Sequence, residues 1–207
     1  MTLYELKPRF QTLLRPLVRG LHGRGATANQ VTLAAAAGSV LTGTIAAYAG
    51  PSHPSIFMLY PVWLLIRMAL NAVDGMLARE FGQKSELGMF LNELCDVISD
   101  TALILPLALV APFSAAHCVI FASAAVLTEF AGALAPAVGA SRRYDGPLGK
   151  SDRALVLGAV GLWFAVTGSL PAWSFAIMPF LIVLSIFTVF NRIRGALREA
   201  SDLHMKG

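Results

Sequence analysis

Charge is what this 207-residue sequence has least of. Only 14% of its residues are Asp, Glu, Lys or Arg, whereas 56% are hydrophobic and the mean hydropathy is +0.66. Soluble domains contain about 25% charged and about 45–50% apolar residues, and a chain this short cannot hide so much apolar surface from water. The composition therefore excludes a soluble enzyme and a disordered chain, and it predicts an integral membrane protein.

Three further absences narrow the fold class. The two cysteines, Cys95 and Cys118, both fall in apolar stretches, so no disulfide framework is expected. The first 25 residues are interrupted by charges and contain no unbroken apolar core, so they do not form a cleavable signal peptide. No internal repeat is visible, which gives no support to a transporter built from inverted repeats.

Apolar stretches fill most of the chain. A membrane-spanning helix takes about 20 apolar residues, and we predict spans near 31–49, 55–79, 87–110, 115–138, 153–169 and 173–192. Residues 3–21 carry apolar side chains at three- and four-residue spacing with basic residues between them, which predicts an amphipathic helix either in the membrane interface or packed on the protein. We therefore expect one all-α integral membrane domain over 1–207, with six transmembrane helices and this N-terminal helix.

The basic residues predict the orientation of the spans. Every Lys and Arg except Arg67 falls in the N-terminal segment, in the loops after spans two and four, or in the C-terminal segment, and the three intervening loops hold none. Basic residues collect on the cytoplasmic side of membrane proteins. The pattern predicts a multi-pass membrane protein with both termini in the cytoplasm, and the net charge of +4 is then explained by topology and anionic lipid, with no nucleic-acid partner.

Polar residues inside predicted spans are costly and are usually functional or paired. They recur at helical spacing on one face of each of two consecutive spans: Arg67, Asn71 and Asp74 in span two, and Asn92, Asp96 and Asp100 in span three. Because a short loop joins these antiparallel spans, the two faces can meet. Opposed oxygen ligands suit a hard divalent cation, and the alternative is a buried polar network that holds the helices together.

The stretch from Asn71 to Asp96 resembles the signature of CDP-alcohol phosphatidyltransferases. That signature reads D-x-x-D-G-x-x-A-R, eight residues, then G-x-x-x-D-x-x-x-D, and this chain matches six of its eight defining positions with unbroken spacing. The segment 27–32, Thr-Ala-Asn-Gln-Val-Thr, is similar to the T-P-N-x-x-T at the start of the family's first span. The departures are Asn71 and Asn92, which stand where the family has its first and third aspartates and carry no charge.

The resemblance implies roles for the matching residues. Mg²⁺ or Mn²⁺ would be held by Asp74 and Asp96, with Asn71 and Asn92 as weaker ligands, and Asp96 would also be the general base. The CDP group would lie against Asn71, Gly75, Ala78, Arg79 and Gly88. Because Asn71 and Asn92 remove two charges, metal affinity is expected to fall, and Glu93 is placed to restore one charge.

Other polar residues have two interpretations each. Lys150, Arg153 and Arg192 are candidates for binding a phosphate on the acceptor, or else they set the topology and contact anionic headgroups. Glu93, Asp100, Arg67 and Glu129 are auxiliary candidates. We expect Arg67 to pair with Asp100 or Glu129, and the alternative is that one of these groups contacts substrate.

The resemblance implies an enzyme of phospholipid biosynthesis in a bacterial inner membrane. It would move a phosphatidyl group from CDP-diacylglycerol to a polar alcohol, release CMP and form a homodimer. Two alternatives are a non-catalytic or metal-weakened relative that binds CDP-lipid, and transfer of a headgroup phosphate from a CDP-alcohol to a lipid alcohol. A transporter or channel would need charged residues in both halves of its spans, and the outer halves lack them.

Overall fold

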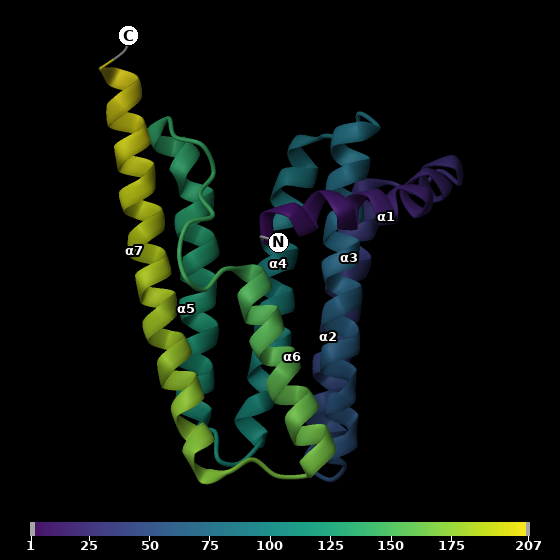
Figure 1. Ribbon diagram of the computed structural model, residues 1–207, viewed down its shortest axis with the longest axis vertical. Coiled ribbons are helices and arrows are strands. Elements are labelled where there is room, and N and C mark those ends of the chain that lie inside the picture. Colours follow the sequence, from purple (N-terminus) through teal and green to yellow (C-terminus); the bar gives the residue numbers. More distant parts are fainter. Residues whose placement is uncertain (1–2, 206–207) are drawn as a thin grey trace.

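The computed structural model describes residues 3–205, and this part of the chain is helical with no strand. Six helices run alongside one another, and α1 lies across them at one end of the bundle (Figure 1). The helices are α1 (Leu3–Gly23), α2 (Ala28–Ala49), α3 (Leu59–Glu80), α4 (Glu86–Ile104), α5 (Ala115–Leu134), α6 (Lys150–Thr167) and α7 (Ile177–His204). Short 3-10 turns extend four of them: η1 (Pro54–Met58), η2 (Leu105–Leu109), η3 (Ala135–Val138) and η4 (Ala172–Ala176).

The helix ends follow local signals in the sequence. Helix α2 starts at Ala28, three residues before the first predicted span, because Thr27 caps it. The Thr27 side chain accepts from the Gln30 amide, and the Gln30 side chain accepts from the Thr27 amide. In the third predicted span, near 87–110, the α-helix ends at Ile104, and Pro106 lies in the 3-10 turn that follows. Helix α7 continues beyond the last predicted span, which ends at 192, and reaches His204.

The helix α2 lies between α3 and α4 and packs against both. The approach to α4 is close enough that a side chain at Gly43 would collide with the Ala102 backbone carbonyl. Toward α3, the Trp63 indole donates to the Ser39 hydroxyl at 2.9 Å. Beyond α4, helix α5 packs on α4 and α7, and α6 packs on α3. This order leaves space between α3 and α4 at the ends where their polar faces lie.

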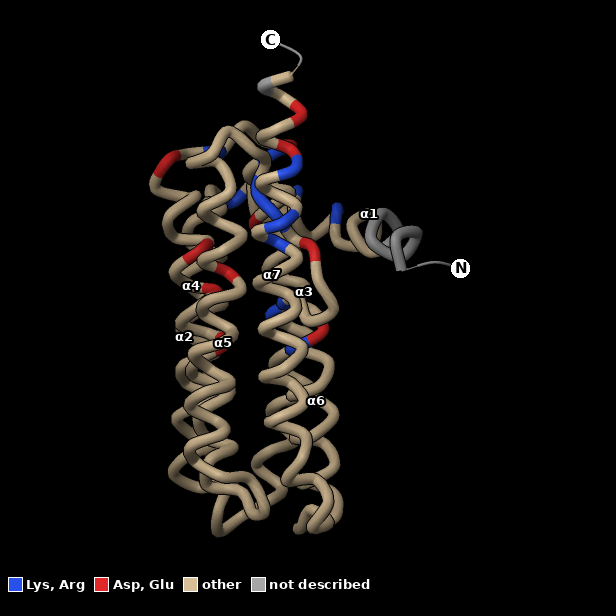
Figure 2. The backbone as a smooth tube through the Cα atoms, turned by 90° about the vertical axis from the view of Figure 1, so that its left-hand side faces the viewer, with Lys and Arg blue, Asp and Glu red and all other residues tan. Residues whose placement is uncertain are grey.

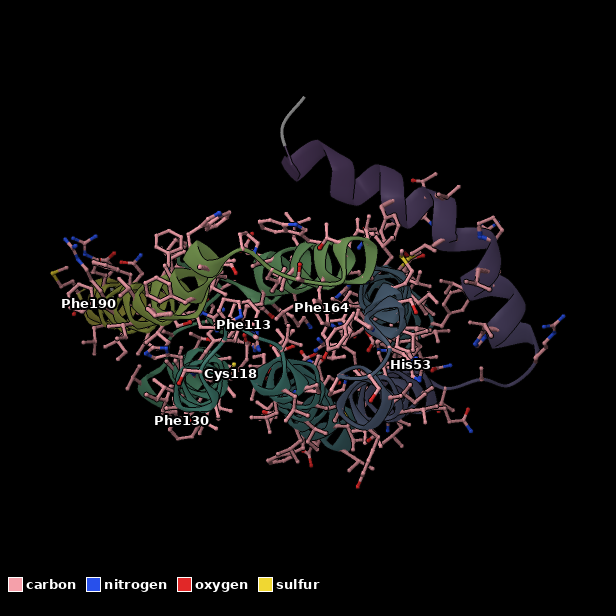
Figure 3. All side chains as sticks on the ribbon, turned by 90° about the horizontal axis from the view of Figure 1, so that it is seen from below. His53, Phe113, Cys118, Phe130, Phe164 and Phe190 are labelled. Atoms are coloured by element: carbon pink, nitrogen blue, oxygen red, sulfur yellow. The ribbon has the colours of Figure 1, made fainter. Side chains whose placement is uncertain are left out.

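One half of the bundle is held together by apolar packing. The Phe57 ring meets the rings of Tyr60 and Phe164 at centroid distances of 5.0 and 5.2 Å, and all three side chains are buried. In Figure 3 Phe164 points inward, whereas Phe130 and Phe190 point away from the bundle. These two outward rings are 58% and 59% exposed, and such an apolar outer surface is what a lipid environment requires.

Charge is confined to the other half of the bundle. Figure 2 shows the described Lys, Arg, Asp and Glu positions gathered between the middle of the bundle and the end near α1 and the C-terminus, with none of them toward the opposite end. The segregation that the sequence predicts is therefore present in three dimensions. Lys206, which the topology argument counts among the C-terminal basic residues, lies outside the described residues.

Four segments are long and apolar enough to cross a membrane: Ala28–Ala49, Pro54–Glu80, Ala115–Val138 and Ala172–Leu203. Helices α4 and α6 lie among them (Figure 1), but they are only 19 and 18 residues long and have charges within that length: four acidic residues in α4, and Lys150, Asp152 and Arg153 in α6. The fold is therefore an all-helical membrane protein, and the count of six spans stays a prediction.

The N-terminal helix α1 packs on the bundle along one side. Val18 is fully buried in a cluster with Val31, Val73 and their neighbours. Leu13 and Leu17 face outward, at 75% and 51% exposure. Packing on the protein, one of the two interpretations of this helix, is therefore observed, and contact of its outward side with the membrane interface stays a prediction.

Candidate active site

A cavity of about 1120 Å³ opens in the charged half, bounded by α2, α3, α4, the loop 139–149, α6 and α7. Twelve of the residues named from the sequence line it: Asn71, Asp74, Gly75, Ala78, Arg79, Gly88, Asn92, Glu93, Asp96, Glu129, Lys150 and Arg192. The other three, Arg67, Asp100 and Arg153, are buried behind its wall. The two polar helix faces therefore meet across one cavity, with α2 packed against both helices.

Asp74 is fixed by a residue of α2. The Thr32 hydroxyl donates to Asp74 Oδ2 at 2.9 Å, and both side chains are buried. The capped start of α2 sets the position of Thr32, which explains what the 27–32 stretch does. Thr32 was not among the predicted site residues, and the only sequence signal for it was that stretch.

Two glycines allow close approach at the cavity wall. The Arg79 guanidinium folds back over Gly75, so a Cβ at Gly75 would lie 2.9 Å from Arg79 Nη2. A Cβ at Gly88 would lie 2.8 Å from Asn29 Oδ1. The side of the cavity where the nucleotide is predicted thus has a smooth wall with a guanidinium beside it.

Asp96 lies between two cations. Lys150 Nζ is 2.6 Å from Asp96 Oδ2, and Arg67 Nη2 is 3.4 Å from Asp96 Oδ1. Asp96 and Arg67 are buried, whereas the Lys150 side chain is 31% exposed. Arg67 therefore holds the Asp96 carboxylate in place at Oδ1, and the Lys150 ammonium pairs with its other oxygen, Oδ2.

A second carboxylate layer lies deeper. Arg67 Nη1 is 2.6 Å from Asp100 Oδ1, which confirms the pairing expected for Arg67. Arg153 bridges the two acids of this layer: its Nε is 2.8 Å from Asp100 Oδ2 and its Nη2 is 2.7 Å from Glu129 Oε1. Because Arg153 is fully buried, this layer connects α3, α4, α5 and α6 beneath the cavity, and Glu129 is its member that reaches the cavity wall.

Arg142 and Arg192 complete the wall opposite Asp74. Arg142 binds both oxygens of Glu93 at 2.6 Å, lies 3.3 Å from Glu129 and stacks over the Tyr144 ring at 4.4 Å. Arg192 Nη1 is 3.4 Å from Glu129 Oε2 and also donates to the Thr128 carbonyl. Sequence reasoning counted Arg142 only as a topology charge, and its one signal was membership of the Arg-Arg-Tyr-Asp run at 142–145.

The loop 139–149 is tied to α7 by ion pairs outside the cavity. Arg143 Nη1 is 2.6 Å from Glu199 Oε2, and its Nε is 2.7 Å from Asp145 Oδ2. The hydrogen bonds from Arg143 lower the pKa of Asp145. The loop is thus held as a fixed wall, which keeps Arg142 in place.

The donor atoms fit the divalent cation that the resemblance implies. Among the residues whose side chains are described, no three His, Cys, Asp or Glu side chains gather in a way that would hold a metal ion. Asp74 and Asp96 do face one cavity together with Asn71 and Asn92, and carboxylate and amide oxygens are the donors that Mg²⁺ and Mn²⁺ prefer. The set is weaker than four carboxylates because two donors are uncharged.

Comparison with known proteins identifies the family. The CDP-alcohol phosphatidyltransferase model matches residues 26–191, which include the cavity-lining residues from Ala28 to Asp152. The inner membrane protein YnbA of Escherichia coli K12 is 44% identical over 203 residues, which cover 98% of this chain and all of that protein.

Two solved structures share the fold. Both are of the phosphatidylinositol phosphate synthase PgsA1 of Mycobacterium tuberculosis. The one with CDP-DAG bound has a TM-score of 0.69 and 22% identity, over 89% of this chain and 92% of that one. The one with manganese and citrate has a TM-score of 0.70 and 24% identity, over 88% of each chain. By the match over 26–191 and the identity to YnbA, this chain belongs to the CDP-alcohol phosphatidyltransferase family.

Proposed function

We propose that this protein transfers a phosphatidyl group from CDP-diacylglycerol to a polar alcohol and releases CMP. The observation that carries the proposal is the cavity in which Asp74, Asp96 and Arg79 face one another, at the charged end of a bundle with an apolar outer surface. Family membership supports it, and so does the shared fold of the synthase that was solved with CDP-DAG bound.

The proposal includes a membrane arrangement. Helices α4 and α6 would span the membrane with the four apolar segments, so that both termini and the cavity face the cytoplasm. The uncharged loops near residues 51, 112 and 170 and the charged opposite end support this orientation. The name of the relative YnbA supports the inner membrane. A homodimer is part of the proposal through the family resemblance.

The reaction replaces one phosphoester bond with another. The acceptor oxygen would attack the phosphorus of the phosphatidyl group, the bond from that phosphorus to the CMP oxygen would break, and Asp96 would take the hydroxyl proton. Arg67 keeps the Asp96 carboxylate oriented, and the partly exposed Lys150 side chain can release the oxygen that receives the proton. Arg79 would contact the departing nucleotide phosphate.

A divalent cation, Mg²⁺ or Mn²⁺, would be held by Asp74 and Asp96 with Asn71 and Asn92. When bound, it neutralises phosphate charge and polarises the phosphorus. The chain's own contribution is to keep Asp74 in place through Thr32 and to keep the carboxylates at the cavity surface, where a charged diphosphate can reach them.

The test is CMP release by the purified full-length protein in lipid nanodiscs, with CDP-diacylglycerol, Mn²⁺ and a panel of alcohols. We expect release that depends on both the alcohol and Mn²⁺. CDP-diacylglycerol binding with no release under any condition would contradict the proposal.

Two observations favour a second candidate, a relative that binds CDP-lipid without turnover. Asn71 and Asn92 remove two charges from the metal site, and Lys150 occupies Asp96. In the same assay this candidate predicts saturable CDP-diacylglycerol binding and no CMP. A parallel arm with a CDP-alcohol and diacylglycerol distinguishes headgroup-phosphate transfer, because CMP would then form only in that arm.

A further inference from the structure

The cavity has two sides, and the acceptor would enter on the side away from Asp74 and Arg79. That acceptor side is formed by Glu93, Glu129, Arg142, Tyr144 and Arg192, all of which line the cavity. Which chemical class of alcohol fits there depends on the charges that remain unpaired. The inference that follows rests on the proposed function.

The buried arginines of this side are already bound to carboxylates. Arg153 is fully buried and uses its guanidinium on Asp100, Glu129, the Thr128 hydroxyl and the Leu148 carbonyl. Arg192, also buried, contacts Glu129 and donates to the carbonyls of Thr128 and Asp145. Arg153 cannot turn to a ligand without weakening the compensation of two buried carboxylates, which is destabilising. Arg192 is held by its two bonds to backbone carbonyls, which it would have to give up to reach a ligand.

The rim arginine is occupied as well. Arg142 forms an ion pair with Glu93, in which Nη2 donates to Oε2 at 2.6 Å and Nε lies 2.6 Å from Oε1, and it makes a further contact with Glu129 while its flat face covers the Tyr144 ring. The edge of the guanidinium that faces Glu93 is the edge that would hold a phosphate. Lys150, the remaining cation nearby, lies 2.6 Å from Asp96 and therefore at the reacting centre.

The charges around the cavity also balance. Five cations pair with or face five carboxylates in this cluster: Arg67, Arg142, Lys150, Arg153 and Arg192 with Asp74, Glu93, Asp96, Asp100 and Glu129. A bound divalent cation and the diphosphate of CDP-diacylglycerol would offset each other. A phosphate monoester, which carries about −1.5 to −2 at neutral pH, would add negative charge beside Glu93 and Glu129, whose neighbouring arginines already contact carboxylates. The two other cations that line the cavity, Arg79 and Lys84, belong to α3 and the loop after it, on the opposite side.

We infer that the acceptor is an uncharged alcohol, such as a polyol, and not a phosphorylated one. Hydroxyl groups can donate to the cavity-facing oxygens of Glu93 and Glu129, which would repel a phosphate. The acids that neutralise the arginines thus select the acceptor by its charge.

Matched pairs of alcohols test the inference with the full-length protein in nanodiscs. CMP release is compared for glycerol against glycerol 3-phosphate, and for myo-inositol against its 1-phosphate. We expect at least one neutral member to react, at a rate about tenfold or more above its phosphate ester. A phosphate ester that reacts as fast as its neutral partner, or faster, overturns the inference.

A binding measurement tests the pocket without turnover. In Glu93→Gln the Arg142 guanidinium loses the negative charge of its partner, so the affinity for inorganic phosphate should rise at least fivefold over the native protein. Glu93 lies at the rim with 22% of its side chain exposed, so the substitution is compatible with folding. The matched control is Glu86→Gln, which removes a carboxylate from the same cavity that has no arginine partner among the residues whose side chains are described.

The outcomes are distinct. Native protein that binds inorganic phosphate as tightly as Glu93→Gln overturns the inference, and so does an equal gain in Glu86→Gln. If no alcohol releases CMP but Glu93→Gln alone gains phosphate binding, the proposed reaction fails and the neutralised pocket stands.

Discussion

The two sides of the cavity differ in how far their polar groups are already paired. On the side of α2, α3 and the first turns of α4, Asn71 and Asn92 make no side-chain hydrogen bond within the described chain. Asp74 accepts from the Thr32 hydroxyl and the Gly75 amide, and it has no ion-pair partner among the described side chains. On the side of α5, α6 and α7, Arg153 and Arg192 are buried with carboxylate partners. The first side has free ligands and the second side has none.

This difference shows where substrate charge can be accommodated. Free carboxylate and amide oxygens can take a cation that a diphosphate brings, so the donor side is built for charged ligands. Paired charges in a low-dielectric interior are held by both partners and resist rearrangement. The acceptor side therefore contributes shape and hydroxyl contacts, and it stiffens the wall behind Asp96.

The sharpest way to break the comparison is Asp96→Asn, because Asp96 belongs to both sides. The amide keeps a hydrogen-bond acceptor for Lys150 and loses the proton acceptor and the charge. We expect CMP release to fall by about 10³-fold, within the range for a general base, while the thermal unfolding midpoint changes little. The control is Asp152→Asn, a carboxylate that lines the same cavity and accepts from the Gly149 amide at 2.8 Å. Native turnover in the Asp96→Asn protein would contradict the assignment of Asp96 as the general base.

Removing a cation from the paired side should affect stability more than chemistry. Arg153→Met leaves Asp100 with Arg67 as its ion-pair partner and removes the 2.7 Å partner of the buried Glu129 carboxylate. We expect a loss of about 3 kcal/mol in unfolding free energy, the lower part of the range for breaking a buried pair. Denaturation followed by helix signal in one detergent measures it. An unchanged midpoint would show that the buried network does not hold the helices together.

Adding charge to the free side should strengthen cation binding. The double variant Asn71→Asp and Asn92→Asp supplies two more carboxylates to the cavity that Asp74 and Asp96 line. We expect Mn²⁺ affinity to rise by about tenfold or more, roughly 1.4 kcal/mol, as read by isothermal titration without substrate. Asp152→Asn again serves as the control. Equal Mn²⁺ affinity in the native and double-variant proteins would contradict the charge argument for this side.

Helical spacing predicts the free side of the cavity well and the paired side poorly. Positions 71, 74 and 78 repeat at three and four residues, so their common face follows from α-helical geometry alone, and the cavity confirms that they share a wall. The pairing of Lys150 with Asp96 joins residues 54 apart. Such a contact depends on how α6 approaches α4, which no local pattern specifies.

The same reason explains what the sequence missed. Arg142 sits in a loop among other basic residues, and only the position of α4 and α5 brings Glu93 and Glu129 to it. Thr32 is one threonine in a span that contains several, and its bond to Asp74 depends on the packing of α2 on α3. The charges of α4 and α6 identify the site and also interrupt the apolar stretches of these two helices, so among the described residues the other four segments alone stand out as long and apolar enough to cross a membrane.

The smallest expected effect is on the unfolding free energy, from an exposed ion pair outside the cavity, and it provides a reference for the buried pairs. Arg15 of α1 pairs with Glu80 of α3 at 3.1 Å, with 42% and 37% of the two side chains exposed. Ion pairs in water contribute about 0–1 kcal/mol and weaken with salt. We expect Arg15→Ala to lower the unfolding free energy by under about 1 kcal/mol, less so at high salt. The measurement is denaturation in the same detergent at low and high salt, beside Arg153→Met. If Arg15→Ala and Arg153→Met lower the unfolding free energy equally, the buried ion pairs behind the acceptor side stabilise the fold no more than an exposed pair does. The rigidity of the acceptor side would then have to come from apolar packing.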